Sequence, residues 1–229
     1  VVGTRPEIIR LSRVMAVLDN YCDHLIVHTG QNYDYELNQI FFDELSIRKP
    51  DFFLNVASKN LGSTIGKIIE KSYKVFQIEK PDAIMVYGDT NSCLSVISAK
   101  RLKIPIFHME AGNRCFDERV PEEINRKIVD HLSDINMVLS DQAKNYLIKE
   151  GISASKIFKT GSHMYEVLQK YKKNFINSKI LAKLKLKKNK YILFSIHREE
   201  NVDNKKNLNL ILDTMNELLE EYKFTIIVS

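Results

Sequence analysis

Acidic and basic side chains are concentrated in the segment that runs from His108 to His131. The residues that stand out are Glu110, Glu122, Glu123, Arg114 and Arg126. Carboxylates exchange protons and stabilise a developing positive charge, whereas the planar guanidinium of arginine binds anions. An ordinary surface loop does not require carboxylates and arginines at this density. The segment is therefore typical of a site that moves protons beside a bound anion.

Further polar residues follow other predicted strands. They are Gly3-Thr4-Arg5-Pro6-Glu7, Gly88-Asp89-Thr90 and Ser195-Ile196-His197-Arg198-Glu199. Open parallel α/β sheets bind ligands at the carboxyl ends of their strands, so these residues are expected at one functional edge. The turn from Gly3 to Pro6 leads into a helix whose amides, with Arg5, would bind a phosphate. It is not the G-x-G-x-x-G pattern of dinucleotide sites, so NAD is not implied.

Each of these candidates also has a purely structural interpretation. Arg5 could face solvent in a simple turn, and His197 could stabilise the end of its strand. Asp89 could cap the helix predicted to begin at Asn91.

In the segment with the highest charge density, Glu122 and Arg126 have the spacing of an ion pair along one helix. Glu110 is harder to explain in this way, because it follows an apolar strand and should be partly buried. A buried carboxylate needs a partner or a function. The residues assigned structural roles are His108, Asp130 and His131.

Short apolar runs alternate with amphipathic stretches along the chain. Strands are predicted over 24–28, 83–87, 104–109, 135–139, 191–196 and 225–228, and helices over 7–18, 35–45, 63–79, 91–100, 121–132, 141–150 and 206–221. Continuous apolar strands separated by helices indicate a parallel sheet covered on both faces. The predicted fold class is therefore α/β with Rossmann-like domains. Asp141 is expected to cap the helix after Ser140, and Gly151 to end it.

Lysines gather between Lys170 and Lys190, where there are nine of them and no acidic residue. Because the formal net charge of the whole chain is +5, the remainder carries −4. A lysine run without interleaved aromatic residues is typical of a solvated helix and connector, which argues against nucleic-acid binding. We interpret its part from about Asn174 to Lys190 as a linker, with a Rossmann-like domain over 1–188 and the start of a second domain over 189–229.

The composition is that of a soluble globular protein, with 44% hydrophobic and 28% charged residues. No apolar run approaches the roughly 20 residues of a membrane span, and no signal peptide is visible, so a cytoplasmic protein without membrane contact is expected. The three cysteines, Cys22, Cys93 and Cys115, form no metal-type pair and indicate free thiols. The chain lacks an initial methionine and ends within a predicted strand, so it is expected to belong to a longer protein.

Taken together, the motifs resemble the non-hydrolysing UDP-N-acetylglucosamine 2-epimerase family. The matching residues, in the order of the family and over the whole chain, are Gly3-Thr4-Arg5-Pro6-Glu7, Gly88-Asp89-Thr90, Glu110-Ala111-Gly112-Asn113-Arg114, Pro121-Glu122-Glu123-Ile124-Asn125-Arg126, Thr160-Gly161-Ser162 and His197-Arg198-Glu199.

A narrower resemblance is to the branch that makes UDP-N-acetyl-L-fucosamine for capsule or O-antigen sugars, by inverting C2 of UDP-2-acetamido-2,6-dideoxy-L-talose. The residues that carry it are His28-Thr29-Gly30-Gln31-Asn32-Tyr33-Asp34, Gly88-Asp89-Thr90-Asn91-Ser92-Cys93, Asn113-Arg114-Cys115-Phe116-Asp117 and Ser195-Ile196-His197-Arg198-Glu199-Glu200-Asn201.

The family resemblance implies two Rossmann-like domains of GT-B type with the active site between them, and a homodimer. The chain would contain the first domain and only the start of the second, and a protein ending at Ser229 is expected to be inactive. The ligand would be a UDP-activated amino sugar, and no cofactor or metal would be required. In the implied mechanism UDP leaves the anomeric carbon, a base removes the C2 proton to give a glycal, and UDP returns after reprotonation from the other face.

Carried over by position, Asp89, Glu110 and Glu122 would transfer protons at C2 and stabilise the cation, with no assignment to one face. The resemblance places His197 and Arg5 at the diphosphate and Arg126 near the nucleotide-sugar.

Two positions depart from the family pattern. Arg10 replaces the phosphate-binding lysine, which preserves the charge and alters its geometry. Gln31-Asn32-Tyr33 replaces the Gln-His-Arg-type segment of members that their own substrate activates, so activation by UDP-N-acetylglucosamine is not expected.

Three alternatives remain open. The protein could be an epimerase that converts UDP-N-acetylglucosamine to UDP-N-acetylmannosamine. It could be a glycosyltransferase of the same architecture, although the carboxylate cluster argues against this. Finally, it could be a binding module that acts through its lysine run.

Overall fold

The computed structural model describes residues 1–30, 41–196 and 199–228. The chain divides into two compact units, Val1–Lys170 and Tyr171–Ser229, and each is described by itself. The predicted division of the chain into domains at residue 188 stays a prediction.

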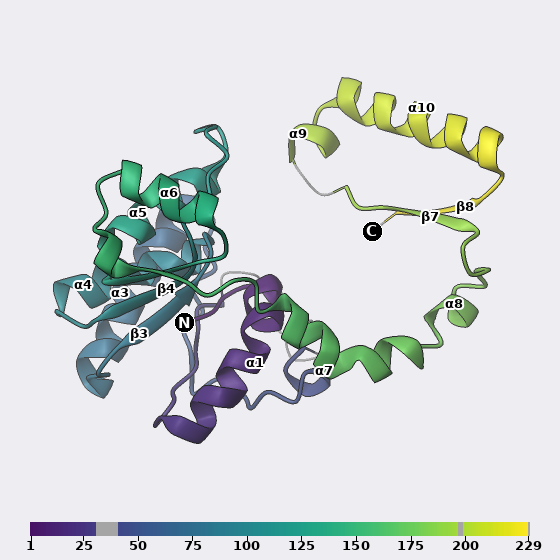
Figure 1. Ribbon diagram of the computed structural model, residues 1–229. Helices are drawn as coiled ribbons and strands as arrows, with labels where there is room; N and C mark the ends of the chain where they lie inside the picture. The colour runs from purple at the N-terminus through teal and green to yellow at the C-terminus, as the bar shows by residue number, and fades with distance from the viewer. Residues whose placement is uncertain (31–40, 197–198, 229) are drawn as a thin grey trace. The chain divides into compact units, whose positions relative to one another are not determined.

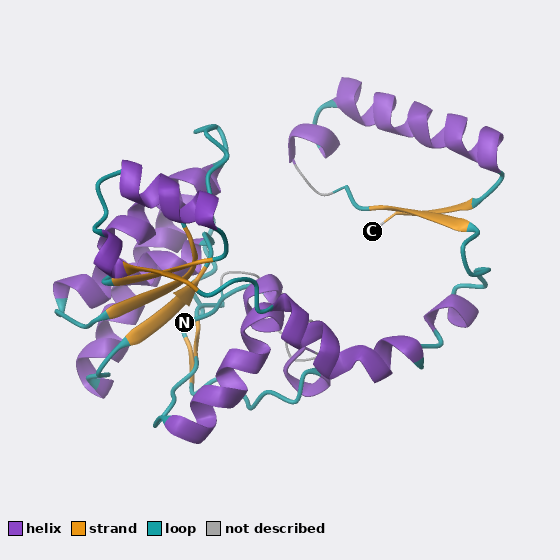
Figure 2. Ribbon diagram, viewed as in Figure 1, coloured by secondary structure: helices purple, strands orange, loops and turns teal. Residues whose placement is uncertain are grey.

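The strands of the first unit are short and parallel (Figures 1 and 2). One sheet pairs β1 (Val27–His28) with β2 (Phe52–Phe53), and the other has the order β3 (Ile84–Tyr87), β4 (Ile106–Ala111), β5 (Ile135–Val138) and β6 (Ile157–Lys159). Val2 forms a parallel bridge with His28, and the Val1 nitrogen lies 2.8 Å from the Met85 carbonyl oxygen. The start of the chain therefore lies between the two sheets. Successive strands extend away from it in opposite directions, which makes this position a topological switch point.

Helices connect these strands in chain order. They are α1 (Arg5–Tyr21), α3 (Leu61–Glu79), the 3-10 turn η1 (Asn91–Ser95) with α4 (Val96–Arg101), α5 (Pro121–Leu132), α6 (Asp141–Lys149), the 3-10 turn η2 (Ala154–Lys156) and α7 (Met164–Ile176), which crosses the division between the units. The side chain of Asn60 accepts a hydrogen bond from the Ser63 amide at the start of α3. This bond satisfies a donor that the first helical turn leaves without an intrahelical partner.

The alternation of side chains along β3 and β4 determines which helices cover each face of the sheet. Val86 and Ile106 belong to a buried cluster with residues of α3, α4 and α5. Tyr87 and Met109, at the alternate positions, join a second cluster with Ile8 of α1. Both faces of the sheet are therefore covered by helices, and each fully buried aliphatic side chain contributes roughly 1.5–3 kcal/mol.

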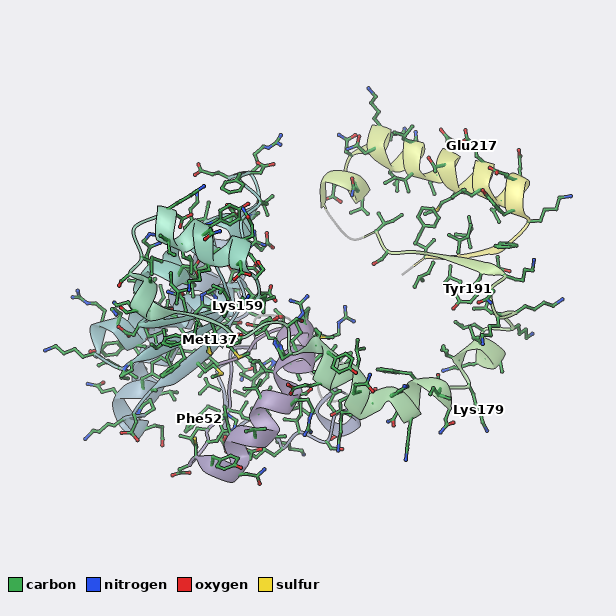
Figure 3. The ribbon with its side chains drawn as sticks, viewed as in Figure 1. Phe52, Met137, Lys159, Lys179, Tyr191 and Glu217 are labelled. Carbon is green, nitrogen blue, oxygen red and sulfur yellow. The ribbon has the colours of Figure 1, made fainter. Side chains whose placement is uncertain are left out.

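The second unit contains a parallel pair of strands, β7 (Tyr191–Phe194) and β8 (Thr225–Val228). Between them in the sequence lie α9 (Glu199–Val202) and α10 (Lys205–Tyr222), and α8 (Ile180–Lys183) precedes them. Side chains of α10 and of the strand pair point toward one another (Figure 3). This is one strand-helix-strand crossover of the kind predicted.

The α/β fold class with parallel strands is confirmed, and several local predictions are wrong. The strand expected over 24–28 is confined to Val27–His28, and the helix expected over 91–100 begins as a 3-10 turn. Ser140, not Asp141, caps α6, because its side chain accepts a hydrogen bond from the Ala143 amide. The strands β2 and β6 and the helix α7 were not predicted, and the helix expected over 35–45 lies largely outside the described residues.

Candidate active site

Three of the candidate positions in the first unit lie where parallel backbone segments end, beside the switch point. Gly3 follows Val2, Asp89 follows β3 and Glu110 lies near the end of β4. Gly3 cannot be replaced without rearrangement, since an added Cβ would lie 1.9 Å from the Ser92 hydroxyl oxygen. The loops at this edge are therefore packed closely enough to fix the backbone around the site.

Glu7 is buried, and its hydrogen bonds connect the start of α1 to the loop after β3. Its Oε2 accepts hydrogen bonds from the Gly3 and Thr4 amides at 2.9 and 2.7 Å, and its Oε1 accepts one from the Thr90 hydroxyl at 2.9 Å. Burial raises the pKa of Glu7, while the bonds from Thr4, Thr90 and the amides act against this rise. Because its oxygens are occupied within the protein, Glu7 has a structural role.

Glu110 lies at a bulge in β4. The register with β5 shifts between Met109 and Ala111, and Glu110 has a φ of 65°, in the left-handed region. Its Oε2 accepts hydrogen bonds from Arg10 Nη1 at 2.7 Å and from the Tyr87 hydroxyl. The prediction of a partly buried carboxylate with a partner is confirmed, since the side chain is 14% exposed. Such backbone strain costs of order 1–3 kcal/mol and recurs at functional sites.

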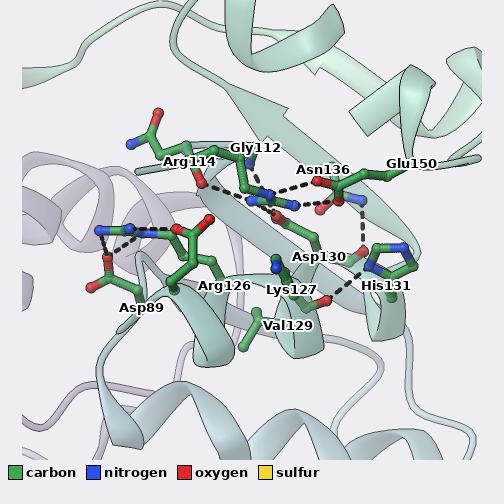
Figure 4. A network of polar contacts seen from close by, with 12 residues as sticks. Asp89, Gly112, Arg114, Arg126, Lys127, Val129, Asp130, His131, Asn136 and Glu150 are labelled. Carbon is green, nitrogen blue, oxygen red and sulfur yellow. Dashed lines mark hydrogen bonds and ion pairs between the residues drawn. The ribbon is translucent and has the colours of Figure 1, made fainter. Parts of the chain in front are cut away.

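Asp89 forms a two-point ion pair with Arg126 (Figure 4). Its Oδ2 lies 2.7 Å from Arg126 Nε and 2.6 Å from Arg126 Nη2. Burial raises the pKa of Asp89, Arg126 lowers it, and the charges of Glu110 and Glu122 raise it again, so that the pKa lies above its usual value. A carboxyl group with a raised pKa in a cluster of other carboxylates is suited to proton transfer.

The structural interpretations of Asp89 and of the Glu122–Arg126 spacing are wrong. Thr90, not Asp89, caps the following 3-10 turn with its side chain. Arg126 pairs with Glu123 at 3.0 Å and with Asp89, and no described contact joins it to Glu122. Glu122 is exposed on the first turn of α5, and its side chain makes no hydrogen bond with any described residue. It thus stays available to a ligand.

Glu123, the adjacent residue on α5, anchors the loop that follows β4. It is fully buried and accepts hydrogen bonds from the Cys115 amide at 3.1 Å and the Phe116 amide at 3.2 Å. Burial by itself would raise the pKa of Glu123, but the bonds from Cys115, Arg126 and Phe116 lower it to about 2. Glu123 is therefore a charged structural residue that holds the loop beside the site.

A second buried network fixes the other side of this loop (Figure 4). The fully buried guanidinium of Arg114 contacts Asp130 at 2.7 Å and Glu150 at 2.6 Å. Asp130 also lies 2.8 Å from His108, whose other ring nitrogen lies 2.8 Å from the Gly88 carbonyl oxygen. The structural assignment of His108 and Asp130 is confirmed by their complete burial. His131 is exposed, with a ring nitrogen 2.9 Å from the Lys127 carbonyl oxygen of its own helix, and its structural role stays a prediction.

The remaining predicted site residues are placed differently. Arg5 is exposed at the start of α1, with its guanidinium 5.7 Å from the centre of the Phe41 ring. Arg10, predicted to bind phosphate, is half-exposed and paired with Glu110. The residues for which no placement is described are His197, Arg198 and Gln31-Asn32-Tyr33, all outside the described residues.

Sequence reasoning missed Tyr87 and His163. Tyr87 is the last residue of β3 and donates its hydroxyl hydrogen to Glu110. His163 lies edge-on to the Tyr87 ring, with 5.3 Å between ring centroids and an interplanar angle of 81°. The position of Tyr87 immediately before Gly88-Asp89 could have indicated a role in the site. An aromatic residue at a strand end is, however, more often part of the core.

Within the described part of the chain, no group of histidine, cysteine or acidic residues has the arrangement of a metal site. No described helix combines the length and the apolar character needed to cross a membrane. Cys22, Cys93 and Cys115 are free cysteines.

Known proteins resemble this chain over most of its length. A family profile described as UDP-N-acetylglucosamine 2-epimerase matches residues 17–229. A Pseudomonas aeruginosa protein named UDP-2,3-diacetamido-2,3-dideoxy-D-glucuronate 2-epimerase is 36% identical over 95% of this chain and 62% of its own length. The chain spans less than two thirds of the length of the curated relatives that it matches.

Two solved structures share the fold. The UDP-N-acetylglucosamine 2-epimerase of Rickettsia bellii is 56% identical, with a TM-score of 0.92 over 99% of this chain and 60% of that one. The Methanocaldococcus jannaschii enzyme, solved with UDP-GlcNAc and UDP, is 38% identical, with a TM-score of 0.91 over 100% of this chain and 64% of that one.

Proposed function

The chain belongs to the UDP-N-acetylglucosamine 2-epimerase family, and from this premise we propose that the full-length protein inverts C2 of a UDP-activated 2-acetamido sugar. The observation that carries the proposal is the pair of carboxylates at the switch-point edge. Asp89 and Glu110 each bind an arginine, and Glu122 lies exposed nearby. Proton transfer at a sugar carbon beside an anionic leaving group requires this combination of charges.

The chemistry balances without a redox partner. The anomeric C1–O bond breaks, and its electron pair leaves on UDP. A carboxylate takes the C2 proton, and the electrons of the C2–H bond form the C1=C2 double bond of a glycal. Protonation at C2 from the other face and return of UDP to C1 then complete the inversion.

In this proposal Asp89, Glu110 and Glu122 serve proton transfer and stabilise the cation. The raised pKa of Asp89 supports an acid-base role, because a carboxyl group with a pKa nearer neutrality can both donate and accept.

The cationic residues act on the leaving group. Arg5 and His197 bind the diphosphate, and Arg126 orients Asp89 beside the nucleotide-sugar. Arg10 contributes positive charge at Glu110. The exposure of Arg5 at a helix start supports its part, since amides and a guanidinium there attract phosphate.

For the substrate, we propose UDP-2-acetamido-2,6-dideoxy-L-talose, with UDP-N-acetyl-L-fucosamine as the product for capsule or O-antigen synthesis. The motifs around Gly88 and Asn113 to Asp117 support this choice through their resemblance to that branch. The names of the relatives favour a second candidate, UDP-N-acetylglucosamine, which would give UDP-N-acetylmannosamine. We further propose that the full-length protein works as a homodimer in the cytoplasm.

Deuterium incorporation tests both the reaction and the substrate. Full-length protein is incubated in deuterium oxide with each UDP-sugar, and C2 is read by NMR or mass spectrometry. We expect deuterium at C2 of the talo and fuco compounds. Exchange on UDP-N-acetylglucosamine instead would overturn the substrate, and no exchange on any UDP-amino sugar would overturn the reaction.

A matched set of variants tests whether the proposed site residues carry out the reaction. Asp89→Asn and Glu110→Gln should each slow exchange about 10²–10⁴-fold, the usual contribution of acid-base groups. The control is Glu118→Gln, a neutral replacement of an exposed glutamate whose partner is the surface residue Lys127. Equal rates in all three variants would show that the carboxylates at the sheet edge are not those that act.

A further inference from the structure

Two hydrogen-bond donors converge on a single oxygen of Glu110. Arg10 Nη1 lies 2.7 Å from Oε2, and the Tyr87 hydroxyl donates to the same atom. Arg10 Nη1 also lies 3.2 Å from the Tyr87 hydroxyl oxygen. The three polar groups thus form a closed triangle around one side of the carboxylate.

The other carboxylate oxygen, Oε1, lies beside residue 88. No described residue donates a hydrogen bond to Oε1 of Glu110. An added Cβ at Gly88 would lie 3.9 Å from Oε1. Because residue 88 is a glycine, it has no side chain that could cover this oxygen, and Asp89 follows it in the sequence.

Tyr87 is held rigidly in the position from which it donates. It is 3% exposed and belongs to the buried cluster of Ile8 and Met109. The Arg10 guanidinium lies 5.6 Å from the centre of the Tyr87 ring, and the ring of His163 packs edge-on against it. Burial and the bond to Glu110 raise the pKa of Tyr87, so its hydroxyl keeps the proton that it donates.

We propose that Tyr87 is a positioning residue for the epimerisation, which holds Oε2 of Glu110 so that Oε1 is the oxygen presented to the sugar. The proposal rests on the proposed function, and it applies whether Glu110 transfers the C2 proton or stabilises the cation. In either role one oxygen must point at the ring with a fixed orientation. A carboxylate bound only by Arg10 could rotate and share both oxygens with the guanidinium, which favours bidentate pairing.

The test is Tyr87→Phe in the full-length protein, which retains the buried ring and removes only the hydroxyl. Its matched control is Tyr146→Phe, the same change on α6, where the ring packs against Phe116. For Tyr87→Phe we expect kcat to fall about tenfold or more, with KM changed less than about twofold. The thermal unfolding midpoint should fall by only a few degrees, because the buried ring is retained and only its hydrogen bonds are lost. Tyr146→Phe should keep the kcat of the wild-type protein.

The outcomes separate the inference from the proposed function. Inactivity of the wild-type protein on every UDP-amino sugar would overturn the proposed function. An unchanged kcat in Tyr87→Phe, or an equal fall in Tyr146→Phe, would overturn the inference alone. A crystal structure of Tyr87→Phe gives a readout without turnover: we expect a rotated Glu110 carboxylate, and an unmoved carboxylate would contradict the role of Tyr87.

Discussion

At the scale of single residues, two adjacent glutamates on α5 have opposite roles. Glu122 is exposed and unpaired among the described residues, whereas Glu123 is buried and bonded to two amides and to Arg126. Their neighbouring positions point about 100° apart around a helix, so one meets solvent and the other the loop. The sequence placed both in the first helical turn and could not distinguish them, because the loop that buries Glu123 is not encoded in the helix pattern.

This contrast predicts opposite effects of two neutral substitutions. The pKa of Glu123 is lowered from 4.5 to about 2, so its charge stabilises the fold above pH 4.5, and this contribution is lost as the pH falls toward 2. At neutral pH the contribution is about 3 kcal/mol. Glu123→Gln should therefore lower the free energy of unfolding in urea at pH 7, and the gap to the wild-type protein should narrow at low pH.

Glu122→Gln is the matched comparison. It should leave the free energy of unfolding within about 0.5 kcal/mol of the wild-type value, as expected for an exposed position. It should slow C2 exchange, the role proposed for this carboxylate. A large loss of stability in Glu122→Gln, or a gap for Glu123→Gln that widens on acidification, would contradict the assignment of roles.

At the scale of elements, the order of strands and helices could be predicted from the sequence. The hydrogen bonds and ion pairs that join one element to another could not. The apolar runs predicted β3, β4 and β5, because a short continuous hydrophobic run is typical of a parallel strand that is buried on both faces. The bulge at Glu110 could not be predicted, since it depends on the register between β4 and β5. The same holds for the pairing of Arg126 with Asp89, which joins residues 37 positions apart in the sequence.

The buried network of Arg114 predicts how much such an ion pair contributes to the stability of the fold. Arg114→Gln would leave Asp130 and part of Glu150 without their cation in a fully or largely buried setting. Breaking one partner of a buried ion pair costs about 3–5 kcal/mol, so the urea midpoint should fall sharply. The control is Arg119→Gln, whose 91% exposed side chain pairs with Asp117 and should cost under about 1 kcal/mol. Similar losses in both variants would contradict the structural role of Arg114.

At the scale of the whole molecule, one residue of the proposed site, His197, lies outside the first unit. Asp89, Glu110, Glu122 and Arg126 all lie in Val1–Lys170. His197 lies in the second unit and outside the described residues. The sequence motifs could propose all of these residues together, because a motif needs only order along the chain. A motif records no distance between its residues, so the geometry of the site could not be predicted from the motifs.

The buried clusters that hold the sheet together all come from residues before 158, so the first unit contains its own core. We therefore expect a piece covering residues 1–178, which retains α7 whole, to unfold cooperatively in urea as followed by circular dichroism. The same piece should show no C2 exchange, because it lacks His197 and the rest of the second unit. Exchange at the full-length rate would place the entire reaction in the first unit. Non-cooperative unfolding would show instead that its core depends on the second.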